Sequence, residues 1–524
     1  MGAYGSSSTT NAPTLERLTK KEKTGAATSS AEHIAGELRY RDVREWIERV
    51  ESFGELKRIS GANWQTEIGA ISEINVHRLP SYALLFDKVP GYPEGFRVLV
   101  CTTNTPRRLA LSLGLPAITT RELVASLRHG RLARWQTESK EFAPQYVSDG
   151  PVFEAVQEGA QVDLEFFPAP IWHDKDGGRY IGTGDAVITV DPDTGWFNAG
   201  AYRCMIAGKN RLSLWMATTN RHGRLHINKY HQRGEPAPVV VTLGQDPLLS
   251  PVLAGMTLPE GISELNVAGA IKGGPLRVVR GPVTGLPIPA DAEIAVEGWV
   301  REGVMCEEGP HGEAPGYYAG GQQAVPAIEV AAIYHRRDPI LVGAPPSKPP
   351  HDFSYSMAVL YSALTHDALE AAGLPGVSQV WFPEEGTGRL LQIIAIKQRY
   401  FGHAKQAGLL CSQVQPAAYL GRMTVVVDDD IDPTDLSEVI WAVVTRADPK
   451  RGYTILDQCW GSPIDPLKQL YPPDTLYSGR VIIDACRPYE HLETFPPVAA
   501  SSPELLSEVW AKWRHLFEKD REIP

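Results

Sequence analysis

Two glutamates, Glu308 and Glu313, flank the bend Gly309-Pro310-His311-Gly312. Glycine and proline disfavour a regular helix or a central strand, so the sequence predicts a loop over 307–313. A loop that holds two carboxyl groups close together suits acid–base chemistry, because burial and mutual repulsion raise the pKa of one while the other stays charged. The alternative interpretation is a solvated acidic turn, which is the common setting of such residues.

Three polar residues upstream, Asn198, His222 and Glu264, stand in otherwise regular surroundings. An amide oxygen, an imidazole and a carboxylate form a ligand set that suits Mg²⁺ or Mn²⁺ bridging to a phosphate better than zinc. The three residues lie far apart in the sequence, so spacing alone does not make them a site. Each of them has the alternative interpretation of a satisfied structural residue.

Arg203 follows Asn198 by five residues. If this segment is a strand, the odd offset predicts that the two side chains point to opposite faces. One face could then hold metal and phosphate, and the other the reacting centre. An arginine buried in such a sheet needs a carboxylate partner, for which Glu308 and Glu313 are the candidates.

The helices and strands that must position these residues fall into regions with different secondary-structure patterns. These patterns predict a mixed α/β chain with several domains. We expect a disordered extension over 1–35, an α/β domain over 36–150, a strand-rich domain over 151–335, an α/β domain over 336–500 and a C-terminal helix within 501–524. The strand-rich domain is predicted to be an antiparallel sheet or barrel, because glycine and proline separate its short apolar runs.

Periodicity predicts the individual elements. Helices are expected at 43–50, 107–114, 119–128, 354–371 and 434–446, and strands at 82–86, 96–100, 186–190, 239–243, 293–297, 328–333, 391–396, 423–427 and 480–484. The last segment, 503–517, places apolar residues on one helical face. That face is expected either to dock onto its own domain or to pack on a neighbouring subunit.

Composition excludes several classes of protein. The 524 residues carry a formal net charge of -11 with no dense basic run in the predicted domains, which argues against nucleic acid or an anionic membrane as the main partner. The six cysteines form no CxxC pair, as expected of a protein from the reducing cytoplasm without a structural zinc site. No apolar run is long enough to cross a bilayer, and the N-terminus lacks a signal-peptide core.

An ordered set of motifs resembles the UbiD family of decarboxylases, which use prenylated FMN. The matching stretches are 168–173 with 176–181, 198–203, 221–223, 258–268, 308–313 with 316–317, 426–432 and 441–446. They run in family order and cover about residue 37 to about residue 500. The resemblance implies an N-terminal α/β domain, a central split β-barrel that binds the cofactor, and a C-terminal α/β domain that closes over it.

The resemblance also implies roles for single residues. Arg203, Glu308 and Glu313 would be the catalytic set, with Glu313 as the proton donor and Arg203 paired with Glu308 to orient the substrate carboxylate. Cofactor contacts and metal ligands are implied as well. A divalent cation, Mn²⁺ or Mg²⁺, would be held on the cofactor phosphate by Asn198, His222 and Glu264. Potassium would lie near Ala199, Ala254, Met256, Glu264 and Arg446. The cofactor itself would contact Asn198, Ala201, Tyr202, Arg203, Arg221, His222, Met256 and Glu264.

Two positions depart from the family pattern. Pro416 stands where some members place a lysine near the flavin, and Arg221 stands where some have glutamine. Arg221 either takes over a phosphate contact or is a surface arginine. The substrate pocket is expected to include Ser462, Pro463 and Ile464, with small residues at Ala358 and Ser462 leaving room for a wide substrate. His351 would reach a polar ring substituent or be an exposed loop histidine.

The implied activity is a reversible, non-oxidative decarboxylation of an aromatic, heteroaromatic or α,β-unsaturated carboxylic acid through a covalent adduct with prenylated FMN. The C-terminal stretches resemble members that act on phthalate-type acids or their CoA thioesters. Implied partners are the aromatic acid, CO₂, a flavin prenyltransferase that supplies the cofactor, and further copies of the chain in a dimer or hexamer. Two alternatives from other classes are a flavin reductase, because split barrels also host reductases, and a catalytically silent flavin-binding protein.

Overall fold

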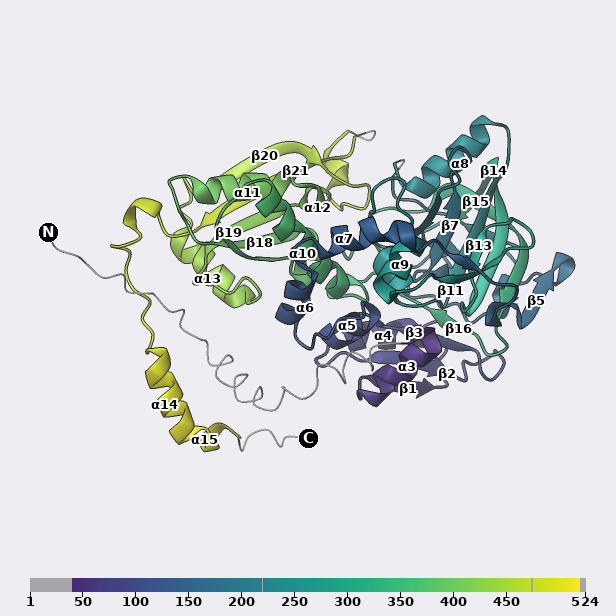
Figure 1. Ribbon diagram of the computed structural model, residues 1–524, viewed down its shortest axis with the longest axis horizontal. Helices are drawn as coiled ribbons and strands as arrows, with labels where there is room; N and C mark the ends of the chain where they lie inside the picture. The colour runs from purple at the N-terminus through teal and green to yellow at the C-terminus, as the bar shows by residue number, and fades with distance from the viewer. Residues whose placement is uncertain (1–39, 219, 473–474, 519–524) are drawn as a thin grey trace.

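The computed structural model describes residues 40–218, 220–472 and 475–518. The extension 1–35, which the sequence predicts to be disordered, lies outside these residues. The described chain is a mixed α/β structure with several sheets, which confirms the predicted fold class. Figure 1 shows the N-terminal sheet below, the large central sheet to the right and the C-terminal sheet to the upper left, with α6 and α7 between them.

The N-terminal domain is built on a sheet in the order β1-β2-β3-β16. Its strands are β1 (Leu56–Ser60), β2 (Ala83–Asp87), β3 (Arg97–Val100) and β16 (Ile340–Val342), and its helices are α3 (Val43–Ser52), α4 (Glu67–Val76), α5 (Pro106–Ser112), α6 (Thr120–Leu127) and α7 (Arg131–Glu138). Helix α3 forms as the periodicity predicts: it buries Val43, Trp46, Ile47 and Val50, and Asp42 caps its first turn.

Strand β16 differs from the predicted domain boundary. The sequence places the C-terminal domain from residue 336, but Ile340–Val342 pair in parallel with β3 of the N-terminal sheet. The chain therefore returns to the first domain after the central sheet. The C-terminal domain begins with α10 at Ser354.

The middle domain contains an antiparallel sheet in the order β10-β15-β14-β11-β7-β8, with β5 paired to β15. Strand β14 is buried almost without interruption over its first half and is more exposed over its second half. The sheet contains β5 (Ala155–Glu158), β7 (Ala186–Val190), β8 (Phe197–Gly200), β10 (Arg211–Ser213), β11 (Ala237–Leu243), β14 (Ile294–Glu308) and β15 (Gln323–His335). Shorter pieces flank it: β4 (Gln145–Tyr146), β6 (Tyr180–Gly182), β9 (Cys204–Met205), β12 (Arg277–Arg280), β13 (Pro287–Pro289), α8 (His222–Gln232), the helical turn η5 (Leu248–Leu253) and α9 (Glu264–Lys272).

The C-terminal domain has a mixed sheet in the order β17-β18-β19-β21-β20. Its strands are β17 (Val377–Trp381), β18 (Leu391–Ile396), β19 (Met423–Asp428), β20 (Tyr453–Trp460) and β21 (Tyr477–Ala485), and its helices are α10 (Ser354–Ala371), α11 (His403–Gln413), α12 (Gln415–Ala418) and α13 (Leu436–Arg446). The predicted bounds of α10 and β18 agree with those of the structure. Within the described residues, no helix is both long and apolar enough to cross a membrane.

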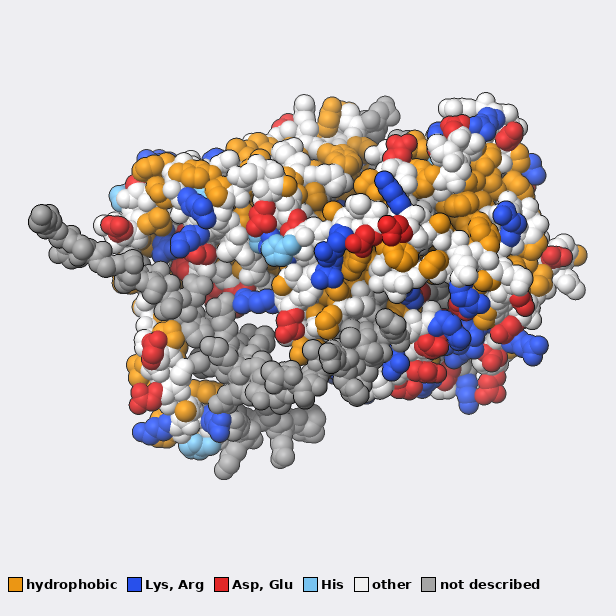
Figure 2. Space-filling view, viewed as in Figure 1, with side chains coloured by type: hydrophobic (Ala, Val, Ile, Leu, Met, Phe, Trp, Pro, Cys, Tyr) orange, Lys and Arg blue, Asp and Glu red, His pale blue; other side chains and the backbone are white. Residues whose placement is uncertain are grey.

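The chain ends in helices α14 (Pro503–Trp513) and α15 (His515–Glu518), and α14 buries none of its residues against the described chain. Leu505, Val509 and Trp513 remain 44–50% exposed. Figures 1 and 2 show the two helices set apart from the domains, with charged side chains of both signs among the apolar ones. The expectation that this face docks onto its own domain is therefore wrong, and packing on a neighbouring subunit stays a prediction.

A buried ion-pair cluster joins the N-terminal domain to the central sheet. Glu293, which is fully buried, accepts two hydrogen bonds from Arg44 at 2.7 and 2.8 Å and one from Arg336 at 3.3 Å. It also accepts the backbone N–H of Ile340 at 3.1 Å. Because Arg44 belongs to α3 and Ile340 to β16, this one carboxylate connects three segments far apart in the sequence.

We expect Glu293→Gln to lower the free energy of unfolding by about 3 kcal/mol, because removal of one partner leaves buried positive charge uncompensated. Chemical denaturation followed by circular dichroism measures this loss. The matched control is Glu51→Gln, since the Glu51–Arg58 pair is half exposed, and its loss should be about 1 kcal/mol or less. Equal midpoints for the two variants would contradict a structural role for the cluster.

Candidate active site

Arg203 lies between the two glutamates of the predicted catalytic set. Its Nε and Nη2 donate to the two oxygens of Glu308 at 2.8 and 3.0 Å, and its Nη1 donates to Glu313 Oε1 at 2.6 Å. The predicted pair of Arg203 and Glu308 thus forms, and the same guanidinium also holds Glu313. Bidentate geometry of this kind fixes the carboxylate plane as well as its distance.

The backbone around Glu308 differs from the predicted loop. Glu307 and Glu308 are the last residues of β14, and the irregular segment starts only at Gly309. The long strand can therefore position Glu308 rigidly. Glu313 sits in the following turn, where its backbone N–H donates to the Tyr317 carbonyl at 2.9 Å.

All three side chains are withdrawn from water. Their exposed fractions are 9% for Arg203, 0% for Glu308 and 6% for Glu313. Burial raises the pKa of Glu313 above its usual range, the nearby Glu308 adds to the increase, and Arg203 opposes it. One arginine facing two carboxyl groups leaves a surplus of negative charge, which a proton on Glu313 removes. The arrangement can thus hold one exchangeable proton at Glu313.

Two aromatic residues that the sequence does not single out complete this set. The Arg203 guanidinium lies 3.9 Å from the centre of the Trp215 ring. The Tyr180 hydroxyl donates to Glu308 Oε1 at 2.8 Å. Tyr180 belongs to the motif 176–181, but nothing in the local pattern shows that its hydroxyl reaches a residue more than 100 positions away. Both contacts keep Arg203 and Glu308 in one orientation.

Asn198, His222 and Glu264 are brought together around one cavity that the catalytic set also borders. Asn198 lies on β8, whereas His222 and Glu264 are the first residues of α8 and α9. The N-termini of two helices therefore approach the same place, and such ends favour an anion such as phosphate.

Glu264 shows that this place suits a cation as well. The side chain is buried and accepts the backbone N–H of Ala199 at 2.8 Å, and no basic side chain among the described residues pairs with it. Burial raises the pKa of Glu264 to about 8. A metal ion would stabilise a carboxylate in this setting, and the amide of Asn198 and the imidazole of His222 line the same cavity. Within the described chain, no cluster of three or more His, Cys, Asp or Glu offers a competing metal site.

The strand argument for Asn198 and Arg203 is wrong. Strand β8 ends at Gly200 and the next strand, β9, starts at Cys204, so Arg203 lies in the irregular link between them. In this link the Ala201 N–H donates to the Ala254 carbonyl at 2.9 Å. Alternation does not apply across such a break. Asn198 and Arg203 consequently border the same cavity and not opposite faces of a sheet.

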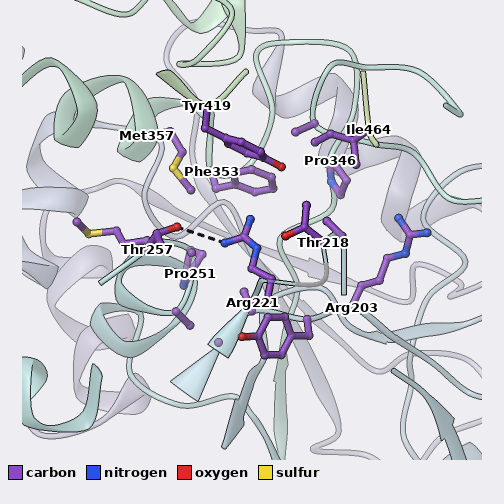
Figure 3. A pocket seen from close by; sticks show the side chains of 18 of the residues that line it. Arg203, Thr218, Arg221, Pro251, Thr257, Pro346, Phe353, Met357, Tyr419 and Ile464 are labelled. Carbon is purple, nitrogen blue, oxygen red and sulfur yellow. Dashed lines mark hydrogen bonds between the residues drawn. The ribbon is translucent and has the colours of Figure 1, made fainter. Parts of the chain in front are cut away.

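The cavity has a volume of about 280 Å³ and lies between the middle and C-terminal domains. The predicted cofactor contacts all line it: Asn198, Ala201, Tyr202, Arg203, Arg221, His222, Met256 and Glu264. Figure 3 shows Arg203 at one side, Arg221 near the middle, and Tyr419 and Phe353 above Arg221.

The predicted potassium ligands are only partly brought together. Ala254, Met256 and Glu264 line the cavity, and Ala199 contacts Glu264 through its N–H. Arg446 lies elsewhere: it ends α13 in the C-terminal domain, where it pairs with Asp428 at 3.1 Å and Asp430 at 3.0 Å. The structure does not place Arg446 among the residues that line the cavity.

Of the predicted substrate-pocket residues, only Ile464 lines the cavity. Ala358 lies on α10 and is packed into a buried hydrophobic cluster, and His351 is fully buried. His351 is therefore not the exposed loop histidine that was one expectation, and it does not border the cavity either. Ser462 touches the wall indirectly, since its hydroxyl lies 2.6 Å from that of Tyr419. Pro463 is half-buried and not part of the lining.

Other residues form the wall of the cavity opposite the middle domain. They are bulky or charged and come from the C-terminal domain and the loop before it: Phe353, Met357, Tyr361, Arg389, Gln415, Tyr419 and Trp460. The idea that small residues at Ala358 and Ser462 widen the pocket thus has no support in the geometry. Gln415 and Tyr419 lie on either side of Pro416 in the sequence, the position where some family members are expected to place a lysine.

The chain is similar to known proteins over most of its length. Three family models match consecutive parts of the chain: the 3-octaprenyl-4-hydroxybenzoate carboxy-lyase (UbiD) N-terminal domain over 47–127, its Rift-related domain over 145–349 and its C-terminal domain over 354–485. The chain is 31% identical to pyrrole-2-carboxylic acid decarboxylase of Pseudomonas aeruginosa, over 85% of this chain and 91% of the relative.

Solved structures show the same likeness. The UbiD-class enzyme HmfF of Pelotomaculum thermopropionicum, solved with FMN, has a TM-score of 0.76 at 28% identity, covering 88% of this chain and 97% of that chain. An evolved dimeric form of it, solved with prenylated FMN, has a TM-score of 0.72 at 27% identity with the same coverage. Vanillic acid decarboxylase of Sedimentibacter hydroxybenzoicus has a TM-score of 0.75 at 26% identity, covering 92% and 100%.

Proposed function

The chain belongs to the UbiD family of carboxy-lyases, and we propose that it decarboxylates an aromatic or heteroaromatic acid, reversibly and without net oxidation, with prenylated FMN bound in the cavity. The observation that supports this function best is the buried Arg203–Glu308–Glu313 set at the cavity that Asn198, His222 and Glu264 also line. In this proposal the catalytic set would supply acid–base groups, and Asn198, His222 and Glu264 would supply ligands for a phosphate and its metal.

Prenylated FMN, when bound, accepts the electron density that the departing CO₂ leaves on the ring. The protein must then deliver a proton to that carbon. Glu313 is the proton donor, because its pKa is raised and Arg203 holds its carboxyl group in a fixed place. In the carboxylation direction the same group removes the ring proton.

Arg203 orients the substrate carboxylate while Glu308 holds the guanidinium from the side of the sheet. Trp215 stacks on Arg203 and excludes water from one face of it. This division leaves Glu308 as a positioning residue for Arg203 and Glu313 as the residue that exchanges protons.

Asn198, His222 and Glu264 would hold Mn²⁺ or Mg²⁺ against the cofactor phosphate, near the N-termini of α8 and α9. A potassium ion would lie beside Glu264, with backbone oxygens from Ala199, Ala254 and Met256 as ligands. Arg446 does not line the cavity and is left out of this proposal.

We further propose that the chain works as a homo-oligomer, a dimer or a hexamer, in which the exposed apolar face of α14 contacts another copy. The solved dimeric relative is consistent with self-association. A flavin prenyltransferase would supply the cofactor. The substrate class includes phthalate-type acids and their CoA thioesters as candidates.

The experiment that tests this function is mass and absorbance analysis of the protein co-expressed with a flavin prenyltransferase, with and without removal of metal by chelation. We expect prenylated FMN and a divalent metal to co-purify, and chelation to release the flavin together with the metal. Hydrogen–deuterium exchange at a ring carbon of a trial acid should then require the loaded protein. A folded protein that binds no flavin under these conditions, or that oxidises NAD(P)H with bound FMN, would overturn the proposal.

A further inference from the structure

Three arginines line the cavity, but only one of them is neutralised. Arg203 has its two glutamates, whereas no ion pair of Arg221 or Arg389 is found in the part of the chain that the structure describes. Arg221 precedes α8 and donates Nη1 to Thr257 Oγ1 at 3.3 Å, as Figure 3 shows. Arg389 comes from the C-terminal domain, before β18, and its Nη2 lies 3.9 Å from Met357 Sδ.

The two unneutralised guanidinium groups approach the same aromatic ring. Arg221 lies 5.9 Å and Arg389 5.8 Å from the centre of the Tyr419 ring. Arg389 also lies 3.4 Å from the centre of the Tyr361 ring. Aromatic faces stabilise a cation but carry no net charge, so the positive charge of the pair remains uncompensated.

The unpaired charges make the protonated form of Arg389 less stable. Burial, together with the charge of Arg221, lowers the pKa of the Arg389 guanidinium, although an arginine stays charged at any physiological pH. Two like charges held in a half-buried cavity repel each other, and an anion placed between them removes the repulsion. Each guanidinium has five N–H donors in a planar fork, and the few contacts above leave most of them for a ligand.

We infer that Arg221 and Arg389 form a second anion-binding site of the cavity, which takes the second carboxylate of an aromatic dicarboxylic substrate and connects the middle domain to the C-terminal domain. The other oxyanion expected in the cavity, the flavin phosphate, is already assigned to the residues Asn198, His222 and Glu264. The class of substrate, but not the anion site itself, rests on the proposed function.

The site is distinct from the catalytic arginine. In Figure 3, Arg203 lies to one side of Arg221, and it is already paired with Glu308 and Glu313. A second anionic group, besides the carboxylate that Arg203 orients, is therefore attracted to Arg221 and Arg389. Because one arginine belongs to each domain, a bound oxyanion also holds the two domains together over the cavity.

The test measures binding by the full-length protein and its Arg221→Gln, Arg389→Gln and Arg389→Lys variants. The probes are FMN against riboflavin, which lacks the phosphate, and isophthalate against benzoate, which lacks the second carboxylate. Flavin binding is followed by fluorescence quenching and the acids by isothermal titration. The matched control is Arg277→Gln, because Arg277 is an exposed arginine of β12 that pairs with Asp291 away from the cavity.

Arg389→Gln should weaken isophthalate binding by about 10- to 100-fold and benzoate binding hardly at all, and Arg389→Lys should restore part of the loss. The affinities of this variant for FMN and riboflavin should stay unchanged. An unchanged preference for isophthalate over benzoate in both glutamine variants would overturn the site. A loss of FMN affinity alone in Arg389→Gln would also overturn it, because the phosphate would then be the ligand.

The salt dependence of binding tests the anion site even if a variant fails to fold, and the isophthalate probe tests it even if no flavin binds. In wild-type protein, binding of the doubly charged probe should weaken with ionic strength more steeply than binding of its partner, which needs no variant to fold. Equal salt dependence within both pairs would also count against the site. Absence of any flavin binding by wild-type protein would instead contradict the proposed function, while the isophthalate arm would still decide on the anion site.

Discussion

Glu313→Gln is expected to reduce the rate of decarboxylation by about 10²–10⁴-fold while leaving the flavin bound. The amide keeps the size of the side chain and its contact with Arg203, but it has no acidic proton to give to the ring carbon. Loss of the exchangeable proton should therefore affect turnover and not binding. Hydrogen–deuterium exchange at the product carbon, measured on loaded protein, reports the proton step directly.

The matched control is Glu307→Gln, six residues upstream, because Glu307 is exposed on β14 and contacts none of the catalytic side chains. This variant should keep full turnover. The pH dependence gives a second check: burial raises the pKa of Glu313, the acid form is the active donor, and so turnover should fall as the pH rises through this raised value. A Glu313→Gln protein with full turnover would exclude Glu313 as the proton donor.

Arg203→Ala should cost both activity and stability. The substitution removes the partner of two buried carboxyl groups, which then face each other without a positive charge. Breaking a buried pair in this way costs about 3–5 kcal/mol, and one of the two glutamates must take up a proton to relieve the repulsion. We also expect turnover to fall by at least about 10²-fold, because nothing then holds the substrate carboxylate in place.

Arg203→Lys separates the two effects. Lysine keeps the positive charge and most of the stability, but it cannot bind Glu308 through two parallel hydrogen bonds, so turnover should still fall markedly. Denaturation midpoints and turnover of loaded protein measure the two quantities. The control is Arg277→Ala, because Arg277 is exposed and pairs with Asp291. This variant should change the denaturation midpoint and the turnover only slightly. Wild-type turnover in Arg203→Lys would contradict the role given to the bidentate contact.

Local patterns predicted most helices and strands because these elements bury one regular face. Helix α3 buries the four residues that its 3.6-residue period picks out, and α10 and β18 have the predicted bounds. The pattern failed where the backbone departs from regularity. Residues 307–308 continue β14 despite the following glycine and proline, and the link between β8 and β9 breaks the alternation that was expected to separate Asn198 from Arg203.

The sequence by itself determined the family, because the matching residues stand in recognisable motifs. It also predicted the residue types that we propose for catalysis and for the phosphate side of the cavity. Only the tertiary structure decided which side chains meet. It placed both Glu308 and Glu313 on one guanidinium, moved Arg446, Ala358 and His351 out of the cavity lining, and brought Arg389 and Tyr419 from the C-terminal domain over Arg221. Contacts between domains depend on how whole sheets dock, and no periodicity within one segment encodes that packing.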